Sequence, residues 1–221
     1  MNLAVLYSGG KDSNLALYRA MKYHNIKVLV NLIPKENSYL YHYPNANLTK
    51  LQAKAIEIPI VQKIVKNEEK DLKEILNYVK KEYDVEGIVT GAVRSTYQAR
   101  IFQKICYDLG LWCFNPLWLN KEEDILREIL KLNFDVIIVG FFAYPFKKEL
   151  IGKKLDENTV NTLIKLWKEY KINPVGEGGE IETFVLDAPF FKKRIKIIDY
   201  ELKIEENSGI LIIKEAKLED K

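Results

Sequence analysis

Cysteine, histidine and long hydrophobic runs are scarce in this sequence. Its two cysteines, Cys106 and Cys113, are too few for a disulfide framework and too widely spaced for a CxxC motif. With only two histidines, His24 and His42, the chain also lacks the ligand set of a structural zinc site. No apolar stretch is long enough to cross a bilayer, and no signal-peptide pattern opens the sequence. We therefore expect a cytoplasmic protein with no membrane partner.

An excess of charge of one sign is missing as well. The chain has 34 lysines and arginines against 31 aspartates and glutamates, which gives a formal net charge of +3. A protein that binds nucleic acid through the phosphates needs a broad basic face, and this balance does not indicate one. Basic clusters at 147–154 and 192–196 are typical of solvated lysine-rich faces. We do not expect a nucleic-acid partner, although one cluster could dock another acidic macromolecule.

Short apolar segments alternate with amphipathic segments in the first half of the chain. We expect strands near 2–7, 27–33, 58–61, 86–91 and 111–115, and helices near 12–24, 46–56, 68–82 and 95–109. Short, uniformly apolar strands separated by helices indicate a parallel sheet that is covered on both faces. Ligands of such sheets bind beyond the carboxyl ends of the strands.

The pattern changes near residue 120. Helices are expected near 121–132 and 157–170, around an apolar run at 134–142. Alternating residues on both sides of Asn207-Ser208-Gly209 predict a β-hairpin. The sequence therefore predicts an α/β domain, residues 1–119, followed by a smaller α+β domain, residues 120–221.

The hexapeptide "SGGKDS", residues 8–13, connects the first strand to the first helix. It is not a Walker P-loop, because Val5 stands where that motif needs a glycine and Asp12 follows Lys11. Two glycines, two hydroxyls, a cation and a carboxylate nevertheless suit a pyrophosphate with its magnesium ion. The simpler alternative is a turn in which Asp12 or Ser13 caps the helix, but that would need neither the glycines nor the lysine.

This hexapeptide resembles the PP-loop of the ATP pyrophosphatase superfamily, whose members cleave ATP between its α- and β-phosphates. Further stretches are "ENSYLYHYPN" with "LQAKAIEIPI" (36–60), "GAVRSTYQ" with "LGLWCFNPLW" (91–118) and "NPVGEGGEIETFVLDAPFF" (173–191). Together they resemble the diphthine–ammonia ligase family over most of the chain. The resemblance implies a PP-loop (HUP-type) five-stranded parallel sheet of order 3-2-1-4-5. It also implies ATP-dependent amidation of diphthine on translation elongation factor 2 with ammonium, through an acyl-adenylate, releasing AMP and pyrophosphate.

The resemblance also implies site residues. Ser8, Gly9, Gly10 and Ser13 would bind pyrophosphate, Lys11 would neutralise the phosphates, and Asp12 would hold Mg²⁺. Gly91 and Ser95 would contact the nucleotide, Glu180 and Glu182 would be catalytic, and Tyr97, Gln98, Glu177, Gly178, Gly179, His42 and Asn45 would bind substrate. The glutamates of "GEGGEIE" have three possible roles: holding ammonium, deprotonating it, or binding the trimethylammonium group of diphthine. A solvated turn is their simpler explanation.

Parts of these stretches have structural explanations. Ser95 and Gln98 fit a capping box, in which each side chain satisfies the other residue's backbone N–H. The family usually has an arginine and a glutamate where this chain has Ile101 and Gln103, and Arg100 is a possible substitute. Two other functions stay open, a tRNA-modifying PP-loop enzyme and an ATP or AMP sensor without turnover. The sequence also leaves the oligomeric state open, including a homodimer.

Overall fold

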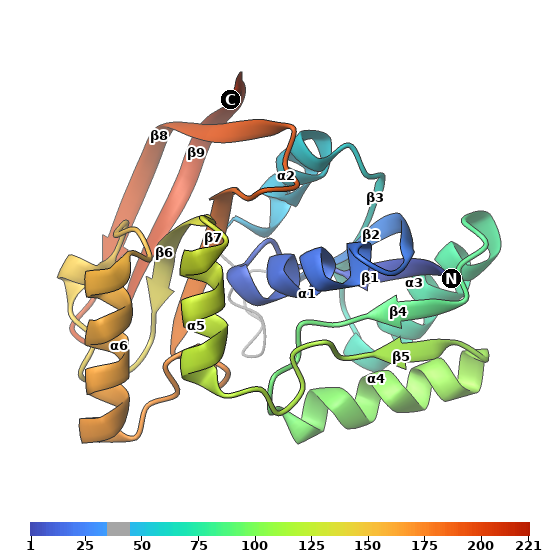
Figure 1. Ribbon diagram of the computed structural model, residues 1–221, viewed down its shortest axis with the longest axis horizontal. Helices are drawn as coiled ribbons and strands as arrows, with labels where there is room; N and C mark the ends of the chain where they lie inside the picture. Colours follow the sequence, from blue (N-terminus) through green and yellow to red (C-terminus); the bar gives the residue numbers. More distant parts are fainter. Residues whose placement is uncertain (35–44) are drawn as a thin grey trace.

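The computed structural model describes residues 1–34 and 45–221 (Figure 1). The first half forms a sheet of β1 (Asn2–Leu6), β2 (Asn25–Pro34), β3 (Ile60–Val65), β4 (Gly87–Val89) and β5 (Trp112–Phe114). All neighbouring strands are parallel and their order is β3-β2-β1-β4-β5. The expected parallel sheet and its strand order are therefore confirmed.

Helices cover both faces of this sheet because its strands alternate between two apolar clusters. Leu3 and Val5 face the cluster that contains α1 (Lys11–Met21) and α2 (Thr49–Ile56). Ala4 faces the other cluster, which contains α3 (Glu68–Glu82) and α4 (Thr96–Leu109). A short 3₁₀ helix, η1 (Ala46–Leu48), precedes α2.

Strand β3 differs from the expectation. The sequence predicts a strand at 58–61, where the apolar run is interrupted by Gln62 and Lys63, but β3 extends from Ile60 to Val65. It lies at the edge of the sheet and most of its residues are only partly buried. An edge strand accepts polar side chains that a central strand would exclude, so the polar pair does not end it.

The second half forms an antiparallel sheet with helices beside it. Its elements are α5 (Glu122–Lys131), β6 (Asp135–Phe141), η2 (Lys148–Leu150), α6 (Glu157–Tyr170), β7 (Ile181–Asp187), β8 (Lys193–Ile204) and β9 (Gly209–Asp220). The strand order is β7-β6-β9-β8, and β8 and β9 form the predicted hairpin. Among the described residues, no helix combines the length and the apolar character needed to cross a membrane.

Helix α1 lies between the two sheets, with the parallel sheet to the right and the antiparallel sheet to the left in Figure 1. One apolar cluster contains Leu15 and Leu17 of α1 together with Ile125 of α5 and Phe184 of β7. The two halves therefore share a core, and their division at residue 120 stays a prediction. This packing brings β7 to the N-terminal end of α1, where the PP-loop lies.

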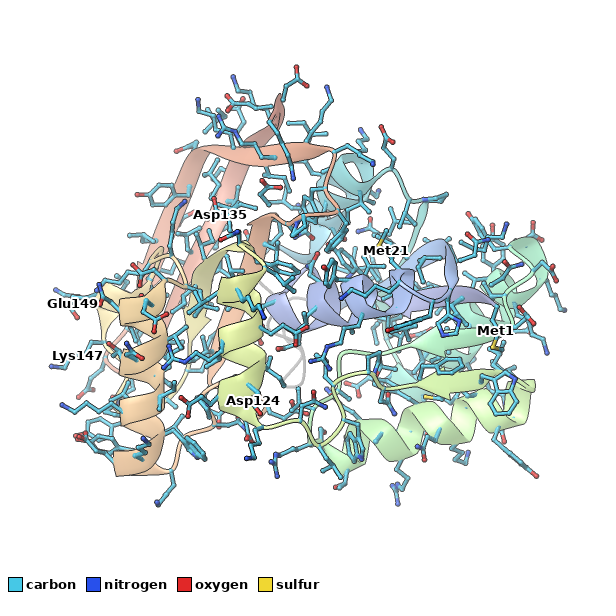
Figure 2. The ribbon with its side chains drawn as sticks, in the orientation of Figure 1. Met1, Met21, Asp124, Asp135, Lys147 and Glu149 are labelled. Carbon is cyan, nitrogen blue, oxygen red and sulfur yellow. The ribbon has the colours of Figure 1, made fainter. Side chains whose placement is uncertain are left out.

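The two basic clusters lie on the surface. Figure 2 shows Lys147 near Glu149 at the outer edge of the molecule, beside α6. The exposed basic residues at the start of β8 are neutralised by carboxylates of β9. Their ion pairs join Lys193 to Asp220, and Arg194 and Lys196 to Glu219. These residues of β8 therefore do not form a free basic face.

Candidate active site

The PP-loop makes a sharp turn between β1 and α1. Gly9 has φ +86°, a conformation that strains residues with a side chain. A Cβ atom at Gly9 would lie 2.4 Å from Oε1 of the buried Gln52. Within the loop, the Gly10 N–H donates to Ser8 Oγ (3.3 Å), and Ser8 Oγ donates to Ser13 Oγ (3.2 Å). Glycine at position 9 is therefore required by backbone conformation and by space.

The start of α1 is capped from the other half of the chain. Its N-cap residue is Gly10, which has no side chain to accept a hydrogen bond. The Lys11 N–H instead donates to Oγ1 of Thr183 on β7 (3.1 Å). The alternative in which Asp12 or Ser13 caps the helix is wrong: Asp12 bonds to Lys11 Nζ, and Ser13 Oγ donates to the Gly10 carbonyl (3.0 Å).

Lys11 and Asp12 form an ion pair at the bottom of the site. Lys11 is only 3% exposed, and its Nζ donates to the Val175 carbonyl and to Asp12 Oδ2, the latter at 2.9 Å. Asp12 Oδ1 is buried and has no hydrogen-bond partner among the described residues. Burial raises the pKa of Asp12, although the Lys11 ammonium opposes this shift. An unpartnered carboxylate oxygen is a ligand of the kind that Mg²⁺ prefers.

Glu182 faces this ion pair from β7. Burial raises its pKa from 4.5 to about 8, and the carboxylate of Asp12 adds to the shift while Lys11 opposes it. The pKa of this carboxyl group thus lies close to physiological pH. A group with such a pKa can both accept and release a proton during a reaction near neutrality.

Glu177 connects the glycine-rich loop to the start of α4. Its Oε1 accepts hydrogen bonds from the N–H groups of Val93 (3.2 Å), Arg94 (2.9 Å) and Ser95 (2.7 Å). The predicted capping box is therefore half right. Ser95 Oγ does accept from the Gln98 N–H (3.3 Å), but Glu177 takes the Ser95 N–H that the Gln98 side chain was expected to satisfy.

Two cavities meet at these residues. The first, about 170 Å³, lies at the carboxyl ends of β1, β2 and β4, with apolar walls that include Leu6, Val30 and Phe102. The second, about 460 Å³, lies between α4 and β7. Counting only the part of the chain that the structure describes, the side chains of Asp12, Glu68, Glu177, Glu180 and Glu182 give the second cavity five carboxylates against one lysine, Lys11. Ser8, Asp12, Gln98, Gly176 and Glu177 line both cavities.

Two models of one known family match the chain. The diphthamide synthase N-terminal domain matches residues 1–113, and the diphthamide synthase C-terminal domain matches residues 121–218. The chain belongs to the diphthamide synthase family. The diphthine–ammonia ligase of Homo sapiens is 34% identical over 251 aligned positions, which cover 100% of this chain and 94% of that protein.

Other relatives give the same family. The diphthine–ammonia ligase of Bos taurus is 35% identical over 90% of this chain and 83% of its own length. That of Schizosaccharomyces pombe is 31% identical over 95% of this chain but only 38% of its own length. These diphthamide synthase relatives are all named as ligases, so the chain is a member of an enzyme family. The described cysteines, Cys106 and Cys113, line neither cavity, unlike the catalytic cysteines expected of a tRNA thiolase.

Most of the residues that the family resemblance implies lie together around the two cavities. They are Ser8, Gly10, Lys11, Asp12, Ser13, Gly91, Ser95, Tyr97, Gln98, Glu177, Gly178, Gly179, Glu180 and Glu182. Gly91 also serves close packing, because a Cβ there would lie 2.9 Å from the Ser13 nitrogen. Glu180 and Glu182 both line the second cavity, and one Glu180 oxygen accepts from the Gly178 N–H (2.9 Å).

Asn45 lies away from the cavities, and His42 lies outside the described residues. The Asn45 amide donates to the Leu211 carbonyl (3.0 Å) and accepts from the Ile213 N–H (2.7 Å), so it is bonded to β9.

The two residues that depart from the family pattern, Ile101 and Gln103, lie in different surroundings. Ile101 is packed in the apolar core beneath α4, whereas Gln103 is exposed.

Arg94, near the predicted site, forms an ion pair with Glu122 (2.7 Å). Its side chain is therefore held by the start of α5 and is not among the residues that line the two cavities. Arg100, the possible substitute for the missing arginine, is exposed on α4 and lines neither cavity.

Sequence reasoning missed the residues that support the loop. Gln52 is fully buried, and its Nε2 donates both to the Gly9 carbonyl (2.9 Å) and to the Val185 carbonyl (2.8 Å). Asn14 accepts from the Tyr7 hydroxyl (2.8 Å) and donates to the Gly10 carbonyl (2.9 Å). One indication of their importance was present in the sequence, because Gln52 and Thr183 lie inside two of the stretches that resemble the family.

Gln52→Leu should destabilise the protein because it leaves two buried carbonyl groups without this donor. We expect a loss of about 1–3 kcal/mol in the free energy of unfolding, measured by urea denaturation. Gln103→Leu, an exposed substitution of the same kind on α4, is the matched control and should change stability little. Equal stabilities of the two variants would show that Gln52 does not hold the loop to β7.

Proposed function

We propose that the chain catalyses the ATP-dependent amidation of diphthine on translation elongation factor 2, with ammonium as the nitrogen donor. The observation that carries the proposal is the meeting of the two cavities at the PP-loop, where Asp12 lines both cavities and Lys11 and Glu182 line the second beside it. The first cavity has the apolar walls and polar mouth suited to a nucleoside. The second has the acidic lining suited to cationic reactants.

In the first step, a carboxylate oxygen of diphthine attacks the α-phosphorus of ATP. A new oxygen–phosphorus bond forms, the bond to the bridging oxygen breaks, and pyrophosphate leaves. The Lys11 ammonium and the N-terminal N–H groups of α1 stabilise the negative charge of the leaving group. Asp12, through its unpartnered Oδ1, is the residue that would hold Mg²⁺, which neutralises phosphate charge when bound.

In the second step, ammonia attacks the activated carbonyl carbon. A carbon–nitrogen bond forms, the bond to the phosphate oxygen breaks, and AMP leaves with the bonding electrons. Ammonium is not a nucleophile until it loses a proton, and the carboxylate of Glu182, which lines the second cavity, would accept that proton. With a pKa of about 8, this group is a stronger base than an ordinary glutamate.

The acceptor would reach the site through the second cavity. Diphthine carries a trimethylammonium group, and Tyr97 at the rim is 51% exposed, so its ring is accessible to a cation. Glu180, in the same cavity, adds a carboxylate on the side of β7. We assign these two residues to the substrate cation and Glu182 to the ammonium ion.

The test is AMP and pyrophosphate release from ATP and Mg²⁺, with ammonium, with and without elongation factor 2 that carries diphthine. We expect release only with the factor, together with the mass change of a carboxyl group becoming an amide. Factor that already carries diphthamide is the matched control and should not support release. ATP binding without release under any of these conditions would contradict the ligase and support a nucleotide sensor.

A further inference from the structure

Strand β8 leaves an open edge on the side of the molecule away from the active site. It is the last strand of the order β7-β6-β9-β8, whereas β7, which contacts the PP-loop, is at the opposite edge. Figure 1 shows β8 beginning beside α2 and running to the left side of the molecule, next to β9. Residues 198–207 are all exposed, and no described strand pairs with the outer edge of β8. Open edges of this kind can pair with another strand.

The apolar surface of the second half continues onto this edge strand. Leu202 is paired with Leu211, and Tyr200 with Ile213, and both β9 residues are buried. Paired residues lie on the same face of a sheet. Tyr200, Leu202 and Ile204 are nevertheless 53%, 46% and 44% exposed, because no further strand lies beside them. The row of apolar side chains therefore stops at the edge without being covered.

The sequence of this segment is self-complementary. Residues 200–204 are Tyr-Glu-Leu-Lys-Ile, with apolar residues at both ends and in the middle. Opposite charges, Glu201 and Lys203, flank the central Leu202 at equal spacing. If two such strands pair antiparallel about a twofold axis through Leu202, residue 201 of one strand lies opposite residue 203 of the other. Residue 200 then lies opposite residue 204.

We propose that β8 pairs with β8 of a second copy of this chain, forming a twofold dimer with a continuous eight-stranded sheet. Glu201 of each copy then faces Lys203 of the other, Tyr200 faces Ile204, and the two Leu202 side chains meet at the axis. Each of these cross-strand pairs is favourable. A twofold axis uses the same patch on both copies, which is what a self-complementary segment provides.

The charge pattern favours a second copy over an unrelated extended peptide. Charged residues on an edge strand normally prevent pairing, because an arbitrary partner leaves them without opposite charges. Here an identical strand supplies both opposite charges in a single register. Within each copy Glu201 forms an ion pair with Lys214 (2.7 Å), whereas Lys203 forms no ion pair with another described residue and is open to the partner. Both active sites stay accessible, since they lie at the β7 edge.

The test is sedimentation equilibrium of the full chain over a range of concentrations. We expect a reversible dimer whose dissociation constant increases by about tenfold or more in Lys203→Glu, because two opposite-charge pairs become like-charge pairs. Glu201→Lys should weaken association to a similar extent. The matched control is Lys168→Glu on α6, which is exposed, makes the same change of charge and should leave the dimer intact.

Mixing the two weakened variants gives the decisive result. In a heterodimer of Lys203→Glu with Glu201→Lys, every position 201 again faces an opposite charge at position 203. The mixture should therefore associate more tightly than either variant alone, which loss of folding cannot imitate. A monomeric wild-type chain at every concentration, a dimer that Lys203→Glu leaves unchanged, or a mixture without heterodimer would each overturn the proposal.

Discussion

Lys11→Ala is expected to lower the rate of AMP formation by about 100-fold to 1,000-fold, the usual effect of removing one preorganised charge stabiliser. Among the described residues, Lys11 is the only lysine or arginine that lines the second cavity, and its ammonium lies 2.9 Å from Asp12 Oδ2. Without it, the negative charge on the departing pyrophosphate loses its closest protein cation. The measurement is single-turnover release of AMP and pyrophosphate at saturating ATP.

The matched control for this variant is Lys22→Ala at the other end of α1. Lys22 is exposed and lies 4.4 Å above the Tyr18 ring, so the substitution removes a lysine without changing the site. It should leave the rate unchanged. If the Lys11→Ala protein has the same free energy of unfolding as the wild type and still forms AMP at the wild-type rate, Lys11 has no role in catalysis. Its ammonium would then only hold the loop that contains Val175.

Glu182→Gln is expected to lower the rate of amide formation by about 100-fold or more, as is usual when a general base is removed. In the wild type, the deprotonated carboxylate is the active form, so this contribution to the rate should increase as the pH increases through about 8. The variant should lose that increase. The measurement is the ratio of wild-type to variant rates at each pH, which removes the titration of ammonium itself.

Hydroxylamine provides the control for the assigned role. It is a free base at neutral pH, so it does not need Glu182 to remove a proton before it attacks. The Glu182→Gln defect should therefore be much smaller with hydroxylamine than with ammonium. An equal defect with both nucleophiles would contradict the role in ammonium deprotonation and indicate a role in binding or adenylation.

The same carboxyl group makes stability depend on pH. Its pKa is about 8 in the folded protein against an ordinary 4.5, so folding favours the protonated form. Its contribution to stability is therefore greatest below pH 4.5 and is lost as the pH rises to about 8. Glu182→Gln should then be more stable than the wild type at alkaline pH, which also verifies that its loss of activity is not a loss of folding.

The parallel sheet was predictable because each strand and helix is encoded by a short stretch of sequence, whereas the strand order followed from the resemblance to the family. The turn from β1 into α1 is also local, and its glycines show its position directly. The support of this turn is not local. Thr183 is 172 positions from Lys11, and no periodic pattern indicates that its hydroxyl caps α1.

The electrostatics of the site also could not be predicted from the sequence. Three glutamates beside glycines are typical of a solvated turn, and the sequence does not say which role each of them plays. The structure separates them: Glu177 is bonded to three N–H groups, Glu180 to one, and Glu182 is placed beside Asp12 with a raised pKa. These differences arise from burial and from neighbours distant in the sequence.

The contacts between the PP-loop and β7 have a consequence for synthesis on the ribosome. The Gly9 carbonyl accepts from the Val185 N–H (3.1 Å), and the Lys11 N–H donates to Thr183. A nascent chain therefore carries its nucleotide-binding turn, made first, without these partners until most of the polypeptide has emerged. A prematurely terminated chain without β7 would leave the Lys11 N–H and the Gly9 carbonyl without these two hydrogen bonds.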